Sequence, residues 1–528
     1  MVEKKYIVAI DQGTSATRCI IFDYVGNIVS SEFAEHKQIY PHPGWVEHNP
    51  AEILQNTNLV IKNSIRKARI DTKEIAAVGV TNQRETVVLW DPTTGEPVYN
   101  AIVWQDTRTK DRCAMLRESG MEASLIHPRT GVYAYPYFSS TKIEWILRNV
   151  PGAEDKARNG NLLFGNIDTW IIWNLTKGRK NNSTPEKNGA HVTDYTNASR
   201  TMLMDLARLE WSSDMLEIFR IPSQMAPSLR PSSDEEVLGY TASTGPFGRE
   251  IPICGDLGDQ QAALVGQVCF GNGDTKNTYG TGCFLLSNLG NELKLSRRGL
   301  VTTVAYGFEE GKCCYSFEGS IAIAGAAVQW LRDNLNMIKS SADTESLAGS
   351  VSGIGSGGVY FVPAFSGLFA PYWDSDARGV MIGLTGYIRK EHLIHATLES
   401  ICWQTRDVFD LMSFETGSKG QSLKVDGGAV SNNYLMQLQA DILGIDVVRP
   451  AVTETTSLGA VYAAGLAVGL WSDTSELQKL WRADRVFRPK WDEDRRARLH
   501  QGWKVAVERC KAWLKEVGEL PSSGTKVD

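Results

Sequence analysis

Two segments about half a chain apart share one pattern: a buried strand run, a Gly-Thr turn and a second strand run. In the first, Tyr6 to Ile10 and Arg18 to Asp23 flank the turn Asp11 to Ser15 (Asp-Gln-Gly-Thr-Ser). In the second, Thr278 to Gly282 (Thr-Tyr-Gly-Thr-Gly) leads into the strand-like run Cys283 to Leu286. Each pattern predicts a β-hairpin. The Gly-Thr pairs lie 267 positions apart, so an internal duplication would put two similar hairpins face to face across a cleft. The alternative is coincidence, because Gly-Thr turns are common.

Strands and helices alternate in the segment that follows. Asn49 before Pro50 is a typical helix start, and the strand run Ile75 to Val80 then delivers Thr81 to Thr86 (Thr-Asn-Gln-Arg-Glu-Thr) at its end. This alternation predicts an α/β fold. A chain of 528 residues is too long for one ordinary core, so we expect two large domains, residues 1–267 and 268–528.

Composition narrows the class of protein. Hydrophobic residues at 42% and charged residues at 22% are typical of globular proteins and argue against disorder and against a membrane protein. The formal net charge of −6 gives no electrostatic footprint for nucleic acid, so no nucleic-acid partner is expected. It also repels a phosphate ligand, so a phosphate site must be built locally from backbone N–H groups, metal and a few cations.

The nine cysteines are scattered and none has C-x-x-C spacing, which favours reduced, mostly buried thiols in a cytoplasmic protein. No signal-peptide pattern precedes the first strand. The Gly- and Ala-rich stretch from Leu458 to Trp471 is too short to span a bilayer and predicts a core helix, so no transmembrane segment is expected. The polar segment from Thr176 to Thr196 predicts an exposed loop inserted in the first domain, and the tail Leu520 to Asp528 is expected to fray.

The first hairpin tip carries groups suited to phosphate. Backbone N–H groups around Gly13 can approach phosphate oxygens because glycine lacks a Cβ, and Thr14 and Ser15 add hydroxyl donors. Asp11 is placed to hold a hydrated Mg²⁺, and Arg18 adds a positive charge. The bland alternative is an ordinary polar turn. The sequence has no Walker A motif, which excludes a P-loop.

A second candidate is the segment Ile253 to Gln261, a short strand that ends in Asp256 and Asp259 flanked by glycines. We expect both carboxylates to be exposed at the strand end. Phosphoryl transfer to an alcohol needs a base near the attacking hydroxyl, and aspartate often fills that role. The alternative is a solvated turn with two surface acids.

Two further motifs suit ligand contact. Val425 to Asn432 (Val-Asp-Gly-Gly-Ala-Val-Ser-Asn) is a strand–Gly-Gly–helix turn, against which a flat base can lie. Arg84 and Glu85 supply a donor and an acceptor for neighbouring hydroxyls of a polyol, with Trp104 and Tyr137 to cover its carbon chain. The alternatives are a common Gly-Gly turn, and a strand-end ion pair with two core aromatic residues.

Taken together, these motifs resemble those of the FGGY carbohydrate kinases, in particular the members that phosphorylate glycerol. The matching motifs occur in the same order as in the family and extend from Tyr6 to about Trp471. Asn82 to Thr86 favours glycerol over longer sugars. The other matching segments are Asp11–Ser15, Gly44–His48, Pro136–Ser139, Gly258–Leu264, Asn277–Gly282, Phe369–Trp373 and Val425–Gly428.

The resemblance implies an actin-like (ribonuclease H-like) α/β fold, with two domains flanking an ATP cleft. It implies phosphate contacts from Thr14, Ser15 and Arg18, and Asp11 as the organiser of Mg²⁺. The implied nucleotide contacts, mainly from the second domain, are Thr281, Gly325, Gln329, Gly428 and Asn432. The implied glycerol contacts are Arg84, Glu85, Trp104, Tyr137, Asp259 and Gln260, with Asp259 as catalytic base.

The implied reaction is ATP-dependent phosphorylation of glycerol to sn-glycerol 3-phosphate, with ATP and Mg²⁺ as cofactors and ADP released. Two alternatives stay open: a kinase of the same family for another polyol or a ketose, and an ATPase or binding module without a small-molecule acceptor. Arg84, Glu85 and Tyr137 argue against the second. The resemblance also implies a homo-oligomer, a dimer or a tetramer.

Two departures from the family limit what is carried over. Position 16 is alanine where relatives often carry a third hydroxyl residue, and Thr17 is not assumed to replace it. The loop Thr241 to Glu250 differs from the Gly-Gly-Thr-Arg loop that binds fructose 1,6-bisphosphate in some bacterial members, so that inhibition is not expected here.

Overall fold

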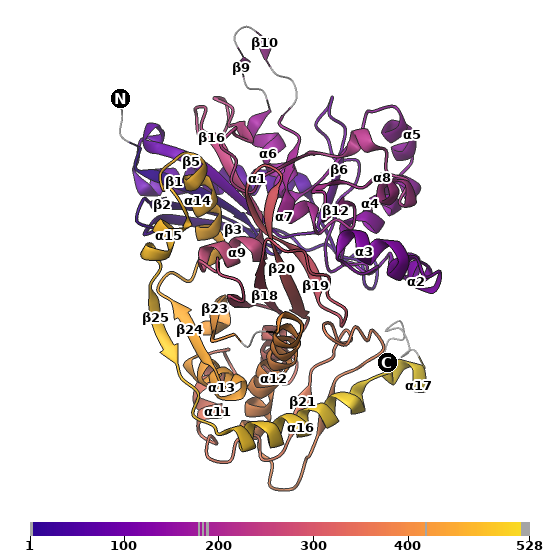
Figure 1. The fold of residues 1–528 in the computed structure, drawn as a ribbon, viewed down its shortest axis with the longest axis vertical. Coiled ribbons are helices and arrows are strands. Elements are labelled where there is room, and N and C mark those ends of the chain that lie inside the picture. Colours follow the sequence, from indigo (N-terminus) through magenta and orange to yellow (C-terminus); the bar gives the residue numbers. More distant parts are fainter. Residues whose placement is uncertain (1–3, 178–179, 182–183, 186–188, 418–419, 519–528) are drawn as a thin grey trace.

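The computed structural model describes residues 4–177, 180–181, 184–185, 189–417 and 420–518. Two large β-sheets form the framework, one from each half of the chain, with helices packed around them (Figure 1). The tail predicted to fray lies outside the described residues.

The first sheet has six strands in the order β15-β16-β5-β1-β2-β3. The hairpin predicted at the start of the chain forms its centre, with β1 antiparallel to β2 and parallel to β5. The strands are β1 (Tyr6–Gln12), β2 (Ala16–Asp23), β3 (Ile28–Glu35), β5 (Ile75–Asn82), β15 (Gly239–Tyr240) and β16 (Pro252–Gly258).

The second sheet has seven strands in the order β19-β20-β18-β17-β23-β24-β25. The predicted second hairpin forms its centre, with β17 antiparallel to β18 and parallel to β23. The strands are β17 (Thr275–Tyr279), β18 (Cys283–Gly290), β19 (Val301–Glu309), β20 (Lys312–Ile321), β23 (Ser422–Asp426), β24 (Asp446–Pro450) and β25 (Ala483–Phe487).

The two sheets share one pairing pattern over six strands. From β3 to β15 the neighbours pair antiparallel, antiparallel, parallel, parallel and antiparallel. From β20 to β25 the same succession recurs, and β19 is an addition at the edge. A chance pair of Gly-Thr turns would not carry this shared topology, so the structure supports the internal duplication.

Helices and short strands complete the fold. The predicted helix start is confirmed, because α1 begins at Pro50 and the Asn49 side chain accepts a hydrogen bond from the backbone N–H of Ala51. A smaller sheet of four strands contains β4 (Glu47–His48), β7 (Ala101–Ile102), β6 (Val87–Trp90) and β8 (Leu163–Asn166). The helices of the first half are α1 (Pro50–Ala68), α2 (Lys110–Glu118), α3 (His127–Thr130), α4 (Ser139–Asn149), α5 (Ala153–Arg158), α6 (Ile167–Thr176), α7 (Tyr195–Ala198), α8 (Ser213–Ile218) and α9 (Asp259–Gly266).

The helices of the second half are α10 (Gly325–Asp333), α11 (Asp343–Gly349), α12 (Lys390–Thr416), α13 (Asn433–Leu443), α14 (Thr455–Ala467), α15 (Thr474–Leu480), α16 (Glu493–Cys510) and α17 (Trp513–Val517). Short two-stranded pairs are β9 (Lys180–Asn181) with β10 (Thr184–Pro185), β11 (Val192–Asp194) with β14 (Ser228–Arg230), β12 (Met204–Asp205) with β13 (Glu210–Trp211), and β21 (Tyr360–Val362) with β22 (Val380–Ile382).

Helix α14 returns from the second half to pack on the first sheet (Figure 1). Its buried side chains join a core with residues of β1, β2 and β16. It also lies tightly against α9: a Cβ on Gly459 would stand 1.8 Å from the backbone oxygen of Ala262. The core helix predicted over Leu458 to Trp471 is therefore confirmed as far as Ala467, where α14 ends, and glycine is what allows its backbone to approach α9 so closely.

The prediction of an exposed loop over Thr176 to Thr196 is partly wrong. Thr176 is the last residue of α6 and is buried, while Val192–Asp194 forms β11 beside β14. Asp194 and Thr196 are fully buried. The ends of the segment carry side chains that hydrogen-bond inside the first half, which a polar composition alone does not reveal. Residues 178–179, 182–183 and 186–188 of the segment lie outside the described residues.

All nine cysteines are free thiols. Seven are buried, and Cys313 and Cys314 are half-buried. Among the helices that the structure describes, none has the length and apolar character to cross a membrane.

Candidate active site

A cavity of about 510 Å³ lies in the second half, enclosed by α10, α11, α12 and the turn after β23. All five residues that the resemblance implied for nucleotide contact line it: Thr281, Gly325, Gln329, Gly428 and Asn432. Asn432 is also the N-cap of α13, because its side chain accepts a hydrogen bond from the N–H of Leu435.

A second cavity of about 540 Å³ adjoins the first, because Gly428 and Ser431 line both. Its walls come from both halves of the chain: Asp11 and Arg18 from the first hairpin, and Thr278 from the second. The two hairpins thus meet at one cavity, as the duplication predicted.

The hairpin tip contributes to this cavity less than predicted. Asp11 and Arg18 line it, whereas Ser15 is exposed and Thr14 is half-buried at the tip. The Thr14 hydroxyl accepts a hydrogen bond from the indole N–H of Trp104 at 2.9 Å, which ties the tip to the neighbouring polyol residues. Thr17 is fully buried in β2, so it does not supply the hydroxyl that alanine lacks at position 16.

Asp11 has the environment of a cation-binding carboxylate. It is 4% exposed, accepts a hydrogen bond from Ser457 at 3.1 Å and lies 3.8 Å from Arg18. Burial raises the pKa of Asp11 to about 6, against the opposing charge of Arg18. Mg²⁺ is usually held by one or two carboxylates together with substrate phosphates. A single buried carboxylate at a cavity wall fits that pattern, and the described residues contain no cluster of three or more His, Cys, Asp and Glu side chains suited to a metal.

Arg84 and Glu85 follow β5 and are buried, at 2% and 1% exposure. Their ion-pair partners are other residues, which argues against the alternative of a strand-end ion pair between the two. Arg84 Nε lies 3.1 Å from Asp259 Oδ1, and Arg84 also donates to Glu318, a residue of β20 in the second sheet. Glu85 has a φ of 61°, a left-handed conformation that is rare outside glycine and tends to occur at functional sites. That backbone turn directs the two neighbouring charges to different partners.

Two buried residues that sequence reasoning missed complete this charged cluster. Arg200 Nε donates to Glu85 at 2.6 Å, and Arg200 Nη2 donates to Glu318 at 3.0 Å. Glu318 thereby joins Arg84 and Arg200, and Arg200 and Glu318 are both 0% exposed. Although burial alone would raise it, the charges of Arg200 and Arg84 hold the pKa of Glu318 at about 2. We call Arg84, Glu85, Arg200, Asp259 and Glu318 the acceptor cluster.

Aromatic rings stand beside the acceptor cluster. The rings of Trp104 and Tyr137 meet edge to face with centroids 5.6 Å apart, and Phe284 of β18 stands 6.2 Å from Trp104. The Arg200 guanidinium lies 5.5 Å from the Tyr137 ring. The two aromatic residues predicted to cover a polyol thus lie together, and the second half adds Phe284, which was not among the predicted contacts.

Asp259 sits where β16 ends and α9 begins. Its side chain keeps 27% of its surface exposed, against 2% for Arg84. Burial raises the pKa of Asp259, while Arg84 and Lys276 oppose that shift. Gly258 permits this arrangement, since a Cβ there would stand 2.6 Å from Arg84 Cδ. Asp259 is therefore a partly accessible carboxylate held by an arginine, which suits a base.

The prediction that both acids of this segment are exposed is wrong for Asp256, which lies inside β16 at 0% exposure. Its carboxyl group faces Asp168 of α6 and Asp194, which caps α7. Burial and these two acids raise the pKa of Asp256 well above its usual range. Asp256 lies inside β16 and Asp259 is the first residue of α9, so the two carboxyl groups have different surroundings.

Gln260 is 5% exposed, and its side-chain oxygen accepts a hydrogen bond from Lys276 at 2.6 Å. Lys276 lies on β17 and is 0% exposed. Sequence reasoning missed this lysine. The sequence feature that could have indicated it is a lone lysine in the segment Thr275 to Tyr279, directly before the second Gly-Thr turn.

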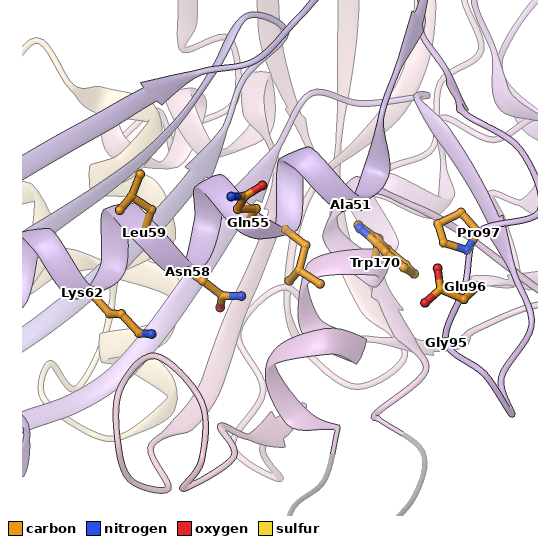
Figure 2. Close-up of a pocket in the computed structure, with 10 residues that line it drawn as sticks. Ala51, Gln55, Asn58, Leu59, Lys62, Gly95, Glu96, Pro97 and Trp170 are labelled. Atoms are coloured by element: carbon orange, nitrogen blue, oxygen red, sulfur yellow. The ribbon is translucent and has the colours of Figure 1, made fainter.

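A further hollow of about 520 Å³ lies elsewhere, between α1 and the turn Gly95 to Pro97, with Trp170 beneath (Figure 2). Its other lining residues are Ala51, Leu54, Gln55, Asn58, Leu59 and Lys62, all on α1. It contains none of the residues predicted for nucleotide or polyol contact, so it does not belong to the candidate site.

Comparisons with known proteins agree with this geometry. Residues 6–266 match the N-terminal domain model of the FGGY family of carbohydrate kinases, and residues 275–468 match its C-terminal domain model. A glycerol kinase of Chloroflexus aurantiacus is 54% identical over 510 residues, 97% of this chain and 99% of the relative. A glycerol kinase of Mycobacterium tuberculosis is 52% identical over 96% of each chain.

Solved structures agree as well. The glycerol kinase of Plasmodium falciparum with ADP has a TM-score of 0.85 at 37% identity, over 97% of this chain and 99% of that one. A xylulose kinase of Lactobacillus acidophilus shares the fold, with a TM-score of 0.81 at 22% identity, over 98% of this chain and 99% of that one. The predicted two-domain α/β fold is confirmed, and the chain belongs to the FGGY family of carbohydrate kinases.

Proposed function

We propose that this chain is a glycerol kinase, an enzyme that transfers the γ-phosphoryl group of ATP to glycerol to give sn-glycerol 3-phosphate and ADP. The observation that carries the proposal is the position of Asp259. Its partly exposed carboxylate is held 3.1 Å from Arg84, and the neighbouring Gln260 is linked through Lys276 to Thr278, which lines the cavity that also contains Asp11 and Arg18. Full-length relatives named glycerol kinase, at 52–54% identity, support glycerol as the acceptor.

In this proposal the acceptor cluster binds the polyol. Arg84 donates to glycerol hydroxyls and Glu85 accepts from them, while Asp259 and Gln260 face the hydroxyl that reacts. Trp104 and Tyr137 cover the carbon chain. Because Glu85 and Arg84 are already held by Arg200 and Glu318, their charges are oriented before the substrate arrives and little reorganisation is needed on binding.

The nucleotide lies in the two adjoining cavities. The adenosine part occupies the one lined by Thr281, Gly325, Gln329, Gly428 and Asn432, and the phosphates cross Gly428 into the other. There Arg18 is the cation of the first hairpin, and the Thr14 and Ser15 tip lies at its edge. Asp11 would hold Mg²⁺, which when bound neutralises negative charge on the phosphates.

The chemical step needs one proton acceptor. Asp259 accepts the proton of the attacking hydroxyl as the new O–P bond forms, and the bond from phosphorus to the oxygen of the leaving ADP breaks. Most of the rate comes from positioning and electrostatics, because the transition state is loose. Closure of the halves would exclude water, which otherwise competes as acceptor and wastes ATP.

The test is ADP release in a coupled assay with glycerol, dihydroxyacetone, erythritol and xylulose as acceptors. We expect the highest kcat/KM with glycerol and almost no release without an acceptor. A higher value with xylulose or erythritol would make the chain a kinase for another polyol or ketose. Release that does not depend on any acceptor would indicate an ATPase instead.

The family resemblance also supports two proposals about the setting of the enzyme: a cytoplasmic location, and a homo-oligomer of two or four subunits. Light scattering of the purified protein after size exclusion tests the second. A mass of one subunit, 58.3 kDa, at assay concentration would contradict it.

A further inference from the structure

Lys276 connects the acceptor residues to the phosphate cavity. Its ammonium donates to the side-chain oxygen of Gln260 at 2.6 Å and to the hydroxyl of Thr278 at 2.9 Å. Gln260 follows Asp259 directly, and Thr278 lines the cavity that also contains Asp11. A single side chain therefore hydrogen-bonds to one residue of the proposed acceptor site and to one residue of the proposed phosphate site.

The strand geometry explains this reach. Lys276 and Thr278 are two residues apart on β17, so their side chains leave the same face of the sheet. That face is turned to α9, whose first residue is Asp259. Lys276 is 0% exposed. A buried lysine is rare unless its charge is matched, so the groups around it need to be identified.

The charges that face Lys276 come from four elements. Asp426 of β23, Asp259 of α9 and Glu318 of β20 favour its charged form, while Arg84 after β5 disfavours it. Burial is the larger effect and lowers the pKa of Lys276 to about 8. Lys276 is thus protonated at neutral pH, in a low-dielectric setting where one positive charge acts strongly on a nearby anion.

An ammonium has three N–H donors, and the structure gives Lys276 two side-chain partners among the described residues. The third donor remains for a ligand. An anion between Asp259 and the phosphate cavity would meet this donor. In phosphoryl transfer that anion is the phosphoryl group that passes from ATP to the acceptor. Arg84 is less available for the same task, because it donates to Gln261 and Glu318 and its remaining donors serve glycerol in the proposed function.

We propose that Lys276 is a further catalytic residue, whose ammonium donates a hydrogen bond to an oxygen of the phosphoryl group as it passes from ATP to the acceptor hydroxyl. Lys276 keeps its proton throughout, and Asp259 takes the hydroxyl proton. This inference rests on the proposed function and adds one residue to it.

The first experiment compares Lys276→Met with the wild type in the ADP-release assay. Loss of a donor that acts in the transition state typically lowers kcat by about 10²–10³-fold. We expect that loss, with KM values for glycerol and MgATP changed by less than about threefold, because the contact forms mainly in the transition state. A kcat within about threefold of the wild type overturns the inference. Wild-type activity is measured first, since its absence would instead remove the proposed function.

Lys424→Met is the matched control. Lys424 pairs with Lys276 across β17 and β23, is half-buried, and donates to the backbone oxygen of Gln267 at 2.7 Å. Unlike Lys276, it donates to backbone oxygens of Gln267 and Val268, and neither of these residues lines the two cavities. We expect Lys424→Met to keep the wild-type kcat, so a general effect of removing a lysine from this sheet would show in both variants.

A double-mutant cycle with Gln260→Ala separates catalysis from positioning. If Lys276 acts on the phosphoryl group, Lys276→Met costs more than Gln260→Ala, and it still lowers kcat when Gln260 is absent. If Lys276 serves only to hold Gln260, the double variant is no slower than Gln260→Ala alone, and the inference fails.

The wild-type pH profile gives a second measurement that needs no variant. kcat/KM for ATP reports ionisations of the free enzyme. Above about pH 8 it should fall about tenfold per pH unit, the slope for loss of one proton, as Lys276 loses its charge. This fall should be absent from the residual activity of Lys276→Met. Should that variant fail to fold, judged by circular dichroism, the wild-type profile decides. A flat profile from neutral pH to about pH 10 would contradict the inference.

Discussion

The acceptor cluster and the nucleotide cavity are both proposed to bind a polar ligand, but the first consists of charged side chains and the second mainly of glycines and neutral side chains. The acceptor cluster contains two arginines and three carboxylates, of which Arg84, Arg200 and Glu318 are at most 2% exposed. The nucleotide cavity offers glycines and neutral side chains such as Gln329 and Asn432. The charges of the acceptor cluster are already paired with each other, whereas the nucleotide cavity presents mainly uncharged groups.

This difference matches the chemical character of the two proposed ligands, glycerol and ATP. Glycerol is small and neutral, so the site must read its hydroxyls with a few strong, fixed donors and acceptors. ATP is large, and carries its own charge and a flat base, so space beside bare backbone is enough for most of it. We therefore expect substitutions on the acceptor side to change catalysis and folding together, and substitutions on the nucleotide side to change only ATP binding.

Asp259→Asn gives the largest expected effect. A general base contributes about 10²–10⁴-fold, so kcat should fall by that factor while the Kd of glycerol changes little. Steady-state kinetics and glycerol titration calorimetry measure the two quantities. Asp256→Asn, three residues earlier on the same segment, is the control and should keep wild-type kcat. An unchanged kcat in Asp259→Asn would remove this residue from the role of base.

Glu318→Gln breaks the acceptor cluster at its centre. Removal of one partner from a buried ion pair typically costs about 3–5 kcal/mol, because Arg84 and Arg200 would be left with less counter-charge. We expect that loss in the free energy of unfolding in urea, together with a raised KM for glycerol. Glu292→Gln removes one partner of the surface pair Glu292–Lys294 and should cost less than about 1 kcal/mol. Equal losses in the two variants would mean that the cluster is not a special feature of the fold.

Gly428→Ala tests the nucleotide side. A Cβ at Gly428 meets no atom within 4 Å, so the fold should tolerate it. The methyl group would stand on the shared wall of the two cavities and raise the KM for ATP by about three- to tenfold, or ~0.7–1.4 kcal/mol. The KM for glycerol and the melting temperature should not change. Gly386→Ala, another position where a Cβ meets no atom, is the control. A shift in glycerol KM would break the separation between the two sites.

Asp256→Asn gives the smallest effect at neutral pH. The raised pKa of Asp256 favours its neutral form, and an asparagine amide is neutral and of similar size. We expect stability within about 1 kcal/mol of the wild type at neutral pH. The pKa of Asp168 is raised to about 6 and that of Asp256 well above its usual range, so the folded state binds more protons than the unfolded chain and loses stability as pH rises through the folded-state values.

The measurement is the pH dependence of unfolding. The slope for one proton is about 1.4 kcal/mol per pH unit, and Asp256→Asn should reduce the decline above about pH 6 by up to that amount. A variant with the same pH dependence as the wild type would show that Asp256 is not the proton carrier.

The sequence predicted the elements that are carried by local patterns. Both Gly-Thr hairpins, the helix start at Asn49 and the turn at Gly428 follow from short motifs, because turn chemistry and capping depend on neighbouring residues. Glu318, Arg200 and Lys276 did not follow from any motif. Each is one charge in an otherwise ordinary segment, and its partners lie up to 234 positions away. Asp256 was wrongly predicted to share the exposure of Asp259: it lies inside β16, whereas Asp259, three residues later, is the first residue of α9.

Helix α14 has a consequence for attempts to study the halves separately. The chain cannot be cut at residue 267 into two self-sufficient pieces, because α14 would leave with the C-terminal fragment. The N-terminal fragment would then present the bare face of β1, β5 and β16 to solvent, including Ile7, Ala9 and Leu257. Such a fragment should aggregate on expression, and co-expression with residues 268–528 should return it to solution.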